Sequence, residues 1–243
     1  YNRRNEQLAD AAERSAVIAD WMGAVPYPKE ALNDAWKRFL WHQFHDDLTG
    51  TSIWEAYTYS WNDEFLAQGQ FCDVILASAG AAASVMDTRA KGSPVLVYNP
   101  AAYSRRSLVE ATVDLPAEAE GVAVYAPDGK TVPAQIVARD GARATVLFAA
   151  AMEPVSYAVY DVRAGKAGKG KVLRASGNTL ENRVYKVTLD ANGDIASVID
   201  KRNGRDLVEK GKAFRLAVLT PNVSNRYPAW EIHKATLDQT PEP

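Results

Sequence analysis

Hydrophobic positions in the first ninety or so residues recur at three- and four-residue steps, a spacing that predicts α-helices. A first helix is predicted as far as Gly23, and the prolines of "AVPYP" then interrupt it, since proline cannot continue a helix. A second helix is predicted from Lys29 to Gly50. The apolar stripes of these two helices are Leu8, Ala11, Ala12, Ser15, Ile18, Ala19 and Met22, then Leu32, Ala35, Trp36, Phe39, Leu40 and Phe44.

A third, longer helix is predicted after Ser52, because Ser52 and Glu55 fit a capping box. Its apolar stripe is Trp54, Tyr57, Trp61, Phe65, Cys72, Ile75, Ala79, Ala82 and Met86. Three amphipathic helices with short breaks predict a three-helix bundle. Helical spacing favours core packing over sugar stacking for Trp36, Trp54 and Trp61, and Cys72 is predicted to be a small buried hydrophobe.

The pattern changes at "RAKGSP", residues 89–94, to short runs rich in β-branched residues and tyrosine. "GKAGKGK", residues 165–171, is predicted to be a flexible connection between strands, and "DANGD" and "KRNG" predict hairpin turns. Strands at this spacing without helices between them predict an antiparallel β-sandwich. The fold class is therefore α+β and multidomain, with a three-helix bundle over residues 1–90 and an incomplete β-sandwich domain over residues 93–243.

The amino-acid composition limits the kinds of binding partner and site that can be expected. Hydrophobic residues make up 47% and charged residues 24% of the 243 residues, which predicts a packed core. The 28 basic and 30 acidic side chains leave a formal charge of −2, so nucleic acid is not expected as a partner. No apolar run is long enough to span a membrane. The single cysteine excludes an internal disulfide and a cysteine-based zinc site, and a cytoplasmic or a periplasmic location is equally compatible.

Candidate chemistry is concentrated in "WHQFHDDLTGTS", residues 41–52. On a helical projection Trp41 and His45 lie opposite the apolar stripe, with His42 beside them. Asp46 and Asp47 would then lie at the C-terminal end of the helix, where carboxylates are unfavourable. One interpretation is metal ligation by an imidazole beside a carboxylate that binds substrate hydroxyls. The other is a set of solvated polar residues at a helix end, since short His/Asp clusters also arise by chance.

The same stretch resembles the Q-x-H-D-x-(Leu/Ile)-x-G-T segment of the family 38 glycoside hydrolases, the class II α-mannosidases. Both "LNDAWKRFLWHQ" and "IWEAYTYSWND" resemble helices of that family's middle domain. Three further stretches resemble its C-terminal β region, namely "VLVYNPAAYSRRSLVEATVDL", "LENRVYKVTLDANGDIASVIDKRNGRDLV" and "YPAWEI". The resemblance follows one order along nearly the whole chain.

The resemblance implies a fragment of a zinc-dependent retaining α-mannosidase that hydrolyses α-mannosides. It implies that His45 is one ligand of a single zinc ion and that Asp46 contacts mannose hydroxyls. His42 and Asp47 match no family role, and His42 is expected to be a surface or supporting residue. The other zinc ligands, the nucleophile and the acid/base are implied to lie in an N-terminal β/α domain outside this chain. The fragment is therefore expected to contain no catalytic residue, to be inactive alone and to bind zinc weakly or not at all.

Two alternatives remain open at this point. One is a non-catalytic carbohydrate- or protein-binding module, in which a helical bundle is fused to a β-sandwich. The other is an independent metal-binding protein that uses His42, His45 and Asp46. The sequence names neither the glycan and its linkage nor the oligomeric state.

Overall fold

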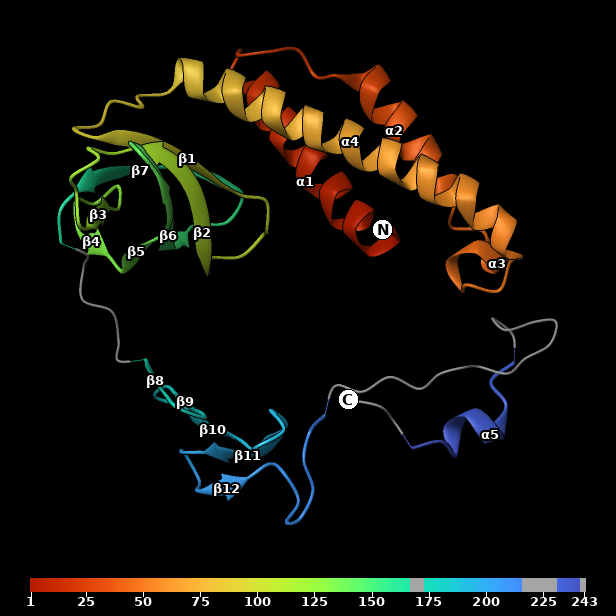
Figure 1. The fold of residues 1–243 in the computed structure, drawn as a ribbon. Coiled ribbons are helices and arrows are strands. Elements are labelled where there is room, and N and C mark those ends of the chain that lie inside the picture. Colours follow the sequence, from red (N-terminus) through yellow and green to blue (C-terminus); the bar gives the residue numbers. More distant parts are fainter. Residues whose placement is uncertain (167–172, 216–230, 241–243) are drawn as a thin grey trace. The chain divides into compact units, whose positions relative to one another are not determined.

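The computed structural model describes residues 1–166, 173–215 and 231–240 (Figure 1). The chain separates into two compact units, Tyr1–Lys169 and Gly170–Pro243. The first unit contains the helical bundle and a β-sandwich, and the second contains a separate sheet and a short helix. The predicted fold class, α+β with a helical bundle followed by antiparallel sheets, is confirmed. The predicted division into domains at residues 90–93 stays a prediction.

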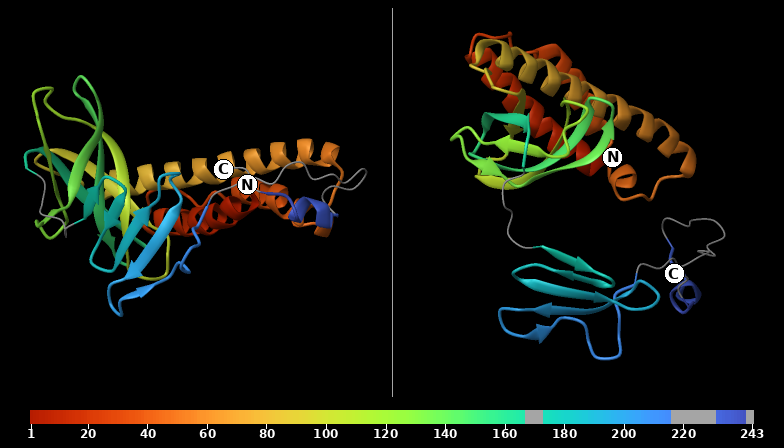
Figure 2. Two further views of the ribbon diagram at one scale, coloured as in Figure 1. Left: turned by 60° about the horizontal axis from the view of Figure 1, so that its bottom comes forward. Right: turned by 60° about the vertical axis from the view of Figure 1, so that its left-hand side comes forward.

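Three long helices form the bundle, and a fourth, very short one lies between the second and third. They are α1 (Asn2–Trp21), α2 (Lys29–Trp41), α3 (His45–Leu48) and α4 (Trp54–Val85). Helices α1, α2 and α4 run alongside one another in all three views (Figures 1 and 2). Gly23 follows α1 with φ +68°, and its amide donates to the carbonyl of Asp20. The predicted end of the first helix is therefore confirmed, because a left-handed residue here suits glycine.

Small side chains bring α1 and α4 close together. Ala9, Ala12 and Ala16 of α1 and Ala67 of α4 are fully buried in one cluster. Phe71 of α4 supplies the bulk of this core, and its ring lies 5.9 Å from that of Trp36 and 6.5 Å from that of Phe39. The cluster holds the bundle together mainly by apolar burial.

The stripe predicted for the third helix is displaced by about one residue. The face of α4 that is buried consists of Ser60, Glu64, Ala67, Phe71, Val74, Ser78 and Ala82. Trp54 and Trp61 are 75% and 57% exposed, so the prediction that they pack in the core is wrong, whereas Trp36 does pack against it. Cys72 is only partly buried. The predicted capping box is also absent, since Ile53 is the N-cap and makes no side-chain cap.

The β-sandwich of the first unit consists of two antiparallel sheets. One has the order β1-β7-β3-β4 and the other β2-β6-β5. The strands are β1 (Ser93–Asn99), β2 (Arg105–Asp114), β3 (Val122–Tyr125), β4 (Thr131–Val132), β5 (Ala134–Asp140), β6 (Arg143–Met152) and β7 (Ser156–Ala164). Alternate residues of β6, from Ala144 to Met152, face a core shared with Val124 and Tyr160 of the other sheet. This alternation is the period-two pattern expected of half-buried strands.

Helix α1 packs against the first sheet through polar contacts. The Tyr98 hydroxyl donates to the carbonyl of Ala11 at 3.2 Å, and the Tyr157 and Ser15 hydroxyls lie 2.9 Å apart. The two tyrosine rings stack 4.7 Å apart, and burial raises the pKa of both hydroxyls. Arg14 donates to the carbonyl of Pro100 at 2.7 Å. The bundle and the sandwich are therefore joined by specific hydrogen bonds.

A tyrosine links the two sheets of the sandwich. The Tyr160 side chain of β7 is fully buried, and its hydroxyl donates to the carbonyl of Ala151 at 2.8 Å and accepts from the Ala151 amide at 2.9 Å. We expect Tyr160→Phe to lower the free energy of unfolding by about 1–3 kcal/mol, because it removes a partner from buried backbone groups. Urea denaturation measures this loss. Tyr103→Phe at a 65% exposed position is the control, expected to change stability by less than about 0.5 kcal/mol.

The second unit contains one five-stranded antiparallel sheet of order β12-β11-β10-β9-β8. Its elements are β8 (Arg174–Ser176), β9 (Thr179–Glu181), β10 (Tyr185–Leu189), β11 (Ile195–Asp200), β12 (Arg205–Asp206) and α5 (Lys234–Leu237). Gly193 and Gly204 have φ of +85° and +72° in the turns β10–β11 and β11–β12, so both predicted hairpins are confirmed. Most of "GKAGKGK", and Tyr227 to Trp230 of "YPAWEI", lie outside the described residues. In the described parts of both units, no helix has the length and apolar character that a membrane span requires.

Candidate functional site

The histidine and aspartate residues of "WHQFHDDLTGTS" do not lie on one helix. Helix α2 ends at Trp41 rather than at Gly50, and α3 begins at His45. The side chain of Gln43 donates to the carbonyl of Phe39 at 3.4 Å, which satisfies an acceptor at the helix end. The helical projection that placed Trp41 and His45 on one face is therefore wrong, because three residues of turn separate the two helices.

This break changes the setting of both aspartates. Asp46 and Asp47 lie in the first turn of α3, and not at the C-terminal end of a longer helix as predicted. Carboxylates near a helix N-terminus face unsatisfied amides, so the unfavourable placement inferred from the sequence does not occur. The two side chains nevertheless have different surroundings, because Asp47 faces the bundle and Asp46 faces the turn that follows α3.

His42 is buried, so the structure excludes the surface position that was one of the two expectations for it and leaves the supporting one. Its side chain is 7% exposed, with Nδ1 2.5 Å from Asp47 Oδ2 and Nε2 3.3 Å from Asp63 Oδ2. The Ser60 hydroxyl lies 2.9 and 2.8 Å from the two carboxylate oxygens of Asp47. His42 is thus enclosed by carboxylates of α3 and α4 and is not on the outer face of the bundle.

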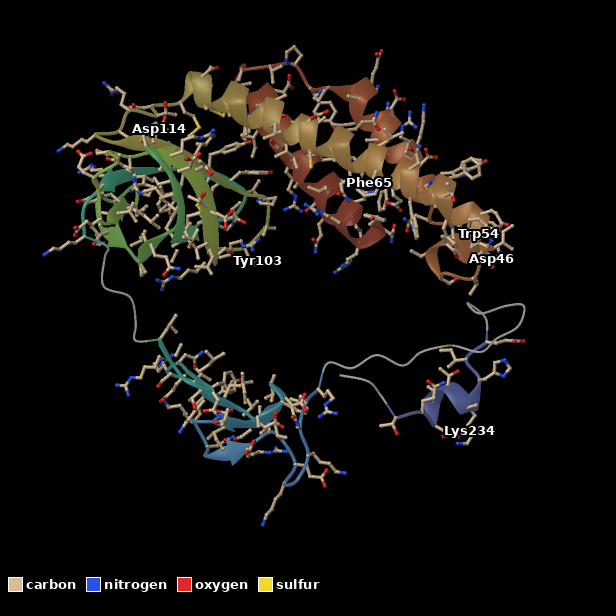
Figure 3. All side chains as sticks on the ribbon, in the orientation of Figure 1. Asp46, Trp54, Phe65, Tyr103, Asp114 and Lys234 are labelled. Atoms are coloured by element: carbon tan, nitrogen blue, oxygen red, sulfur yellow. The ribbon has the colours of Figure 1, made fainter. Side chains whose placement is uncertain are left out.

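His45 is exposed and lies beside Asp46. The His45 side chain is 78% exposed, and its Nε2 is 3.5 Å from Asp46 Oδ2. Its ring lies against that of Phe44, with centroids 4.2 Å apart. Both residues lie where α3 meets the start of α4, the region labelled by Asp46 and Trp54 in Figure 3. An imidazole and a carboxylate are therefore presented together at an accessible surface.

The turn after α3 holds Asp46 through its backbone and its side chain. The carbonyl of Asp46 accepts from the amides of Thr51 and Ser52 at 3.0 and 2.9 Å. The Thr51 hydroxyl lies 3.1 Å from Asp46 Oδ1. The Tyr57 hydroxyl donates to the Asp46 carbonyl at 3.2 Å and accepts from the Ser52 amide at 2.8 Å. Gly50, with φ +79°, allows the chain to reverse so that these bonds can form.

A surface hollow of about 550 Å³ is lined by residues around the end of α2, in α3 and around the start of α4, among them His42 and Ser52. Its lining includes the aromatic rings of Trp41, Phe44 and Tyr59 and the polar groups of Asp47 and Ser60. Trp41 is 78% exposed, which agrees with a role at a domain interface or at the edge of a substrate and does not distinguish between them. Aromatic walls with a few polar groups are typical of small-molecule sites.

Three residues of this region were not identified from the sequence: Tyr57, Ser60 and Asp63. Tyr57 was assigned to the core stripe, and the other two were not considered. Ser60 and Asp63 are spaced i, i+3 on α4, which places two polar side chains on neighbouring positions of one helix surface. Polar residues on the side of a bundle helix that faces its neighbours are the signal that could have indicated them.

The described residues do not form a metal site by themselves. Among the residues that the structure describes, no group of three or more His, Cys, Asp or Glu side chains is placed to hold a metal ion. The alternative of an independent metal-binding protein required His42, His45 and Asp46 together, but His42 is paired with Asp47 and Asp63. His45 is exposed and has a ring nitrogen near a carboxylate, an arrangement found in single metal ligands. The chemistry of His45 therefore fits one ligand of a metal ion, and a complete site would need further ligands besides it.

Comparison with known proteins gives matches to a family model, to a sequence relative and to solved structures. Residues 1–79 match the family model described as the alpha mannosidase middle domain. Over 238 residues the chain is 25% identical to Alpha-mannosidase 2C1 of Mus musculus, which includes 95% of this chain and 20% of that protein. The chain thus spans about a fifth of the length of this relative.

Two solved structures from Enterococcus faecalis share the fold. One is described as an alpha-mannosidase from strain V583 and the other as a protein in the Glycosyl Hydrolase Family 38. Each has a TM-score of 0.66 and 22% identity over 84% of this chain. The match includes 28% of the first of those chains and 29% of the second.

Proposed function

Because this chain belongs to the family 38 glycoside hydrolases, as a segment that contains their α-mannosidase middle domain, we propose that it forms one side of the active site of a zinc-dependent retaining α-mannosidase. In this proposal the parent enzyme hydrolyses α-mannosides. The observation that carries the proposal is the exposed pair His45 and Asp46, held together at the end of the bundle by the turn after α3.

His45 is proposed as one ligand of the zinc ion. Its imidazole is exposed and makes no hydrogen bond to the backbone among those described, so a ring nitrogen is available to a cation. Zinc in proteins takes three or four side-chain ligands, so the remaining ones must come from another part of the parent. When bound, the ion acts as a Lewis acid that attracts oxygen atoms of the sugar.

Asp46 is proposed to bind mannose hydroxyls. An ionised carboxylate accepts hydrogen bonds only, and sugar hydroxyls are donors that suit it. The Thr51 hydroxyl lies 3.1 Å from Oδ1, and the Asp46 carbonyl accepts from the amides of Thr51 and Ser52 and from the Tyr57 hydroxyl, so the carboxylate is directed before a sugar arrives. A preoriented acceptor costs less entropy on binding than a mobile one.

Asp46 and Asp47 do not suit the two carboxyl roles of a retaining glycosidase. Such enzymes place two carboxyl groups about 5–5.5 Å apart on either side of the scissile bond. Asp46 and Asp47 are adjacent in α3, and Asp47 is already bound by His42 and Ser60. We infer that the nucleophile and the acid/base belong to a part of the parent outside this chain, and that the segment alone does not hydrolyse mannosides.

Metal removal from the full-length parent tests the proposal. We expect hydrolysis of a nitrophenyl α-mannoside to be lost on dialysis against a chelator and restored by one equivalent of zinc. The matching β-mannoside and α-glucoside serve as controls and should be poor substrates. A full-length protein that binds mannosides but never hydrolyses them would instead identify a carbohydrate-binding module.

A further inference from the structure

The cluster of His42, Asp47, Ser60 and Asp63, in which His42 and Ser60 are buried and the two carboxylates partly buried, has no part in the proposed chemistry. It nevertheless connects three elements, because His42 follows α2, Asp47 belongs to α3, and Ser60 and Asp63 belong to α4. Both ring nitrogens of His42 face carboxylate oxygens, at 2.5 Å for Asp47 and 3.3 Å for Asp63. Buried polar groups are costly unless they are paired, so the arrangement of this cluster is strongly constrained.

Asp47 is the point where the cluster meets α3. The Ser60 hydroxyl lies 2.9 and 2.8 Å from its two carboxylate oxygens, and Nδ1 of His42 lies 2.5 Å from Oδ2. The Asp47 side chain is only 15% exposed. These bonds attach α3 on one side to α4 and on the other to the residue that follows α2.

Helix α3 depends on such attachments for its orientation. It has four residues, too few for a helix that is stable without tertiary contacts. Asp47 immediately follows Asp46 and lies two residues after His45. A rotation of α3 about its axis would therefore move His45 and Asp46 together, and the bond between His42 and Asp47 opposes that rotation.

We propose that His42 is a positioning residue that acts through Asp47 to fix α3, and thereby His45 and Asp46, in the orientation that the active site requires. The inference rests on the proposed function, since it assigns the purpose of this orientation to metal and sugar binding. His42 itself touches neither ligand in this proposal. Loss of a group that supports a metal ligand typically costs about 10- to 100-fold in activity or metal affinity.

Two isosteric substitutions separate the bonds made by the two ring nitrogens. The amide nitrogen of asparagine can occupy the place of Nδ1, and that of glutamine the place of Nε2. In the full-length enzyme, we expect His42→Asn to keep kcat/KM within about 3-fold of the original, because it retains the donor to Asp47. We expect His42→Gln to lose about 10- to 100-fold in kcat/KM, because it retains only the contact to Asp63.

Amide hydrogen exchange in the metal-free enzyme supplies a readout that does not depend on activity. The amides of Asp47 and Leu48 donate to the carbonyl of Phe44 at 2.9 Å, and those of Thr51 and Ser52 donate to the carbonyl of Asp46. We expect these amides to exchange at least about tenfold faster in His42→Gln than in His42→Asn, since local opening then costs less free energy. Equal exchange and equal kcat/KM in His42→Asn and His42→Gln would overturn the inference.

A control variant separates positioning from general stability. Glu13 of α1 accepts from the Trp36 indole at 2.8 Å and from the Tyr27 hydroxyl, inside the same bundle. Glu13→Gln should lower the melting temperature without changing kcat/KM or the exchange of the α3 amides. If His45→Ala leaves zinc and activity unchanged, the proposed function fails. If His45→Ala loses both, but His42→Asn and His42→Gln behave alike, only this inference fails.

Discussion

Replacement of His45 by alanine should remove the zinc and the α-mannosidase activity that we propose for the full-length protein, while leaving the fold intact. His45 is 78% exposed, and no core residue depends on it, so we expect a change in melting temperature within the range of an ordinary surface substitution. Loss of a residue that merely supports a ligand costs about 10- to 100-fold, and loss of a ligand itself should cost more. We therefore expect kcat/KM to fall by more than about 100-fold and bound zinc to fall well below one equivalent.

Metal analysis measures the bound zinc of His45→Ala, and steady-state kinetics measures its kcat/KM. His233, which is also exposed and lies 3.6 Å from Glu231, provides a matched histidine outside the α3 turn. His233→Ala should retain one zinc and full activity. Unchanged zinc content and rate in His45→Ala would show that the metal assignment is wrong.

The second large effect concerns Asp46. Asp46→Asn keeps the size of the side chain and the acceptor that faces Thr51, but it removes the charge and one acceptor oxygen. A hydrogen bond to a charged group contributes about 1.5–3 kcal/mol, which corresponds to roughly 10- to 150-fold for each sugar hydroxyl. With more than one hydroxyl bound, kcat/KM should fall by about 100-fold or more.

Zinc content distinguishes this effect from that of His45. Asp46→Asn should retain its zinc, because the proposal gives Asp46 a sugar contact and not a metal bond. Asp34→Asn, an exposed carboxylate of α2, is the control and should behave like the original enzyme. If Asp46→Asn lost its zinc, the division of roles between His45 and Asp46 would have to be abandoned.

The β elements could be predicted closely from the sequence because their signals are local. Alternation along residues 143–152 and glycine in the turns at 193 and 204 depend on neighbouring residues alone. The predicted face of the third helix was wrong for the opposite reason. The stripe followed the large residues Trp54, Trp61 and Phe65, but α1 offers alanines, and close packing against them selects the small-residue face around Ala67.

The site could be predicted only in part. The resemblance to the family indicated His45 and Asp46, and the structure places these two side by side. The break after Trp41 was missed because no glycine or proline marks it, and the helical period continues through it. The role of Asp47 depends on His42 and Ser60, which are 5 and 13 residues away, so sequence spacing alone could not reveal it.

Helix α4 begins directly after the turn that holds Asp46 and ends shortly before the first strand of the sandwich. Its 32 residues correspond to about 48 Å at 1.5 Å per residue, a length that no other element in the described part of the chain approaches. One inserted residue would advance one end by about 1.5 Å and turn it by about 100° relative to the other. Insertions or deletions in this helix should therefore be tolerated only when they restore the rotation of one end relative to the other. The loops of the sandwich should tolerate changes of length more readily.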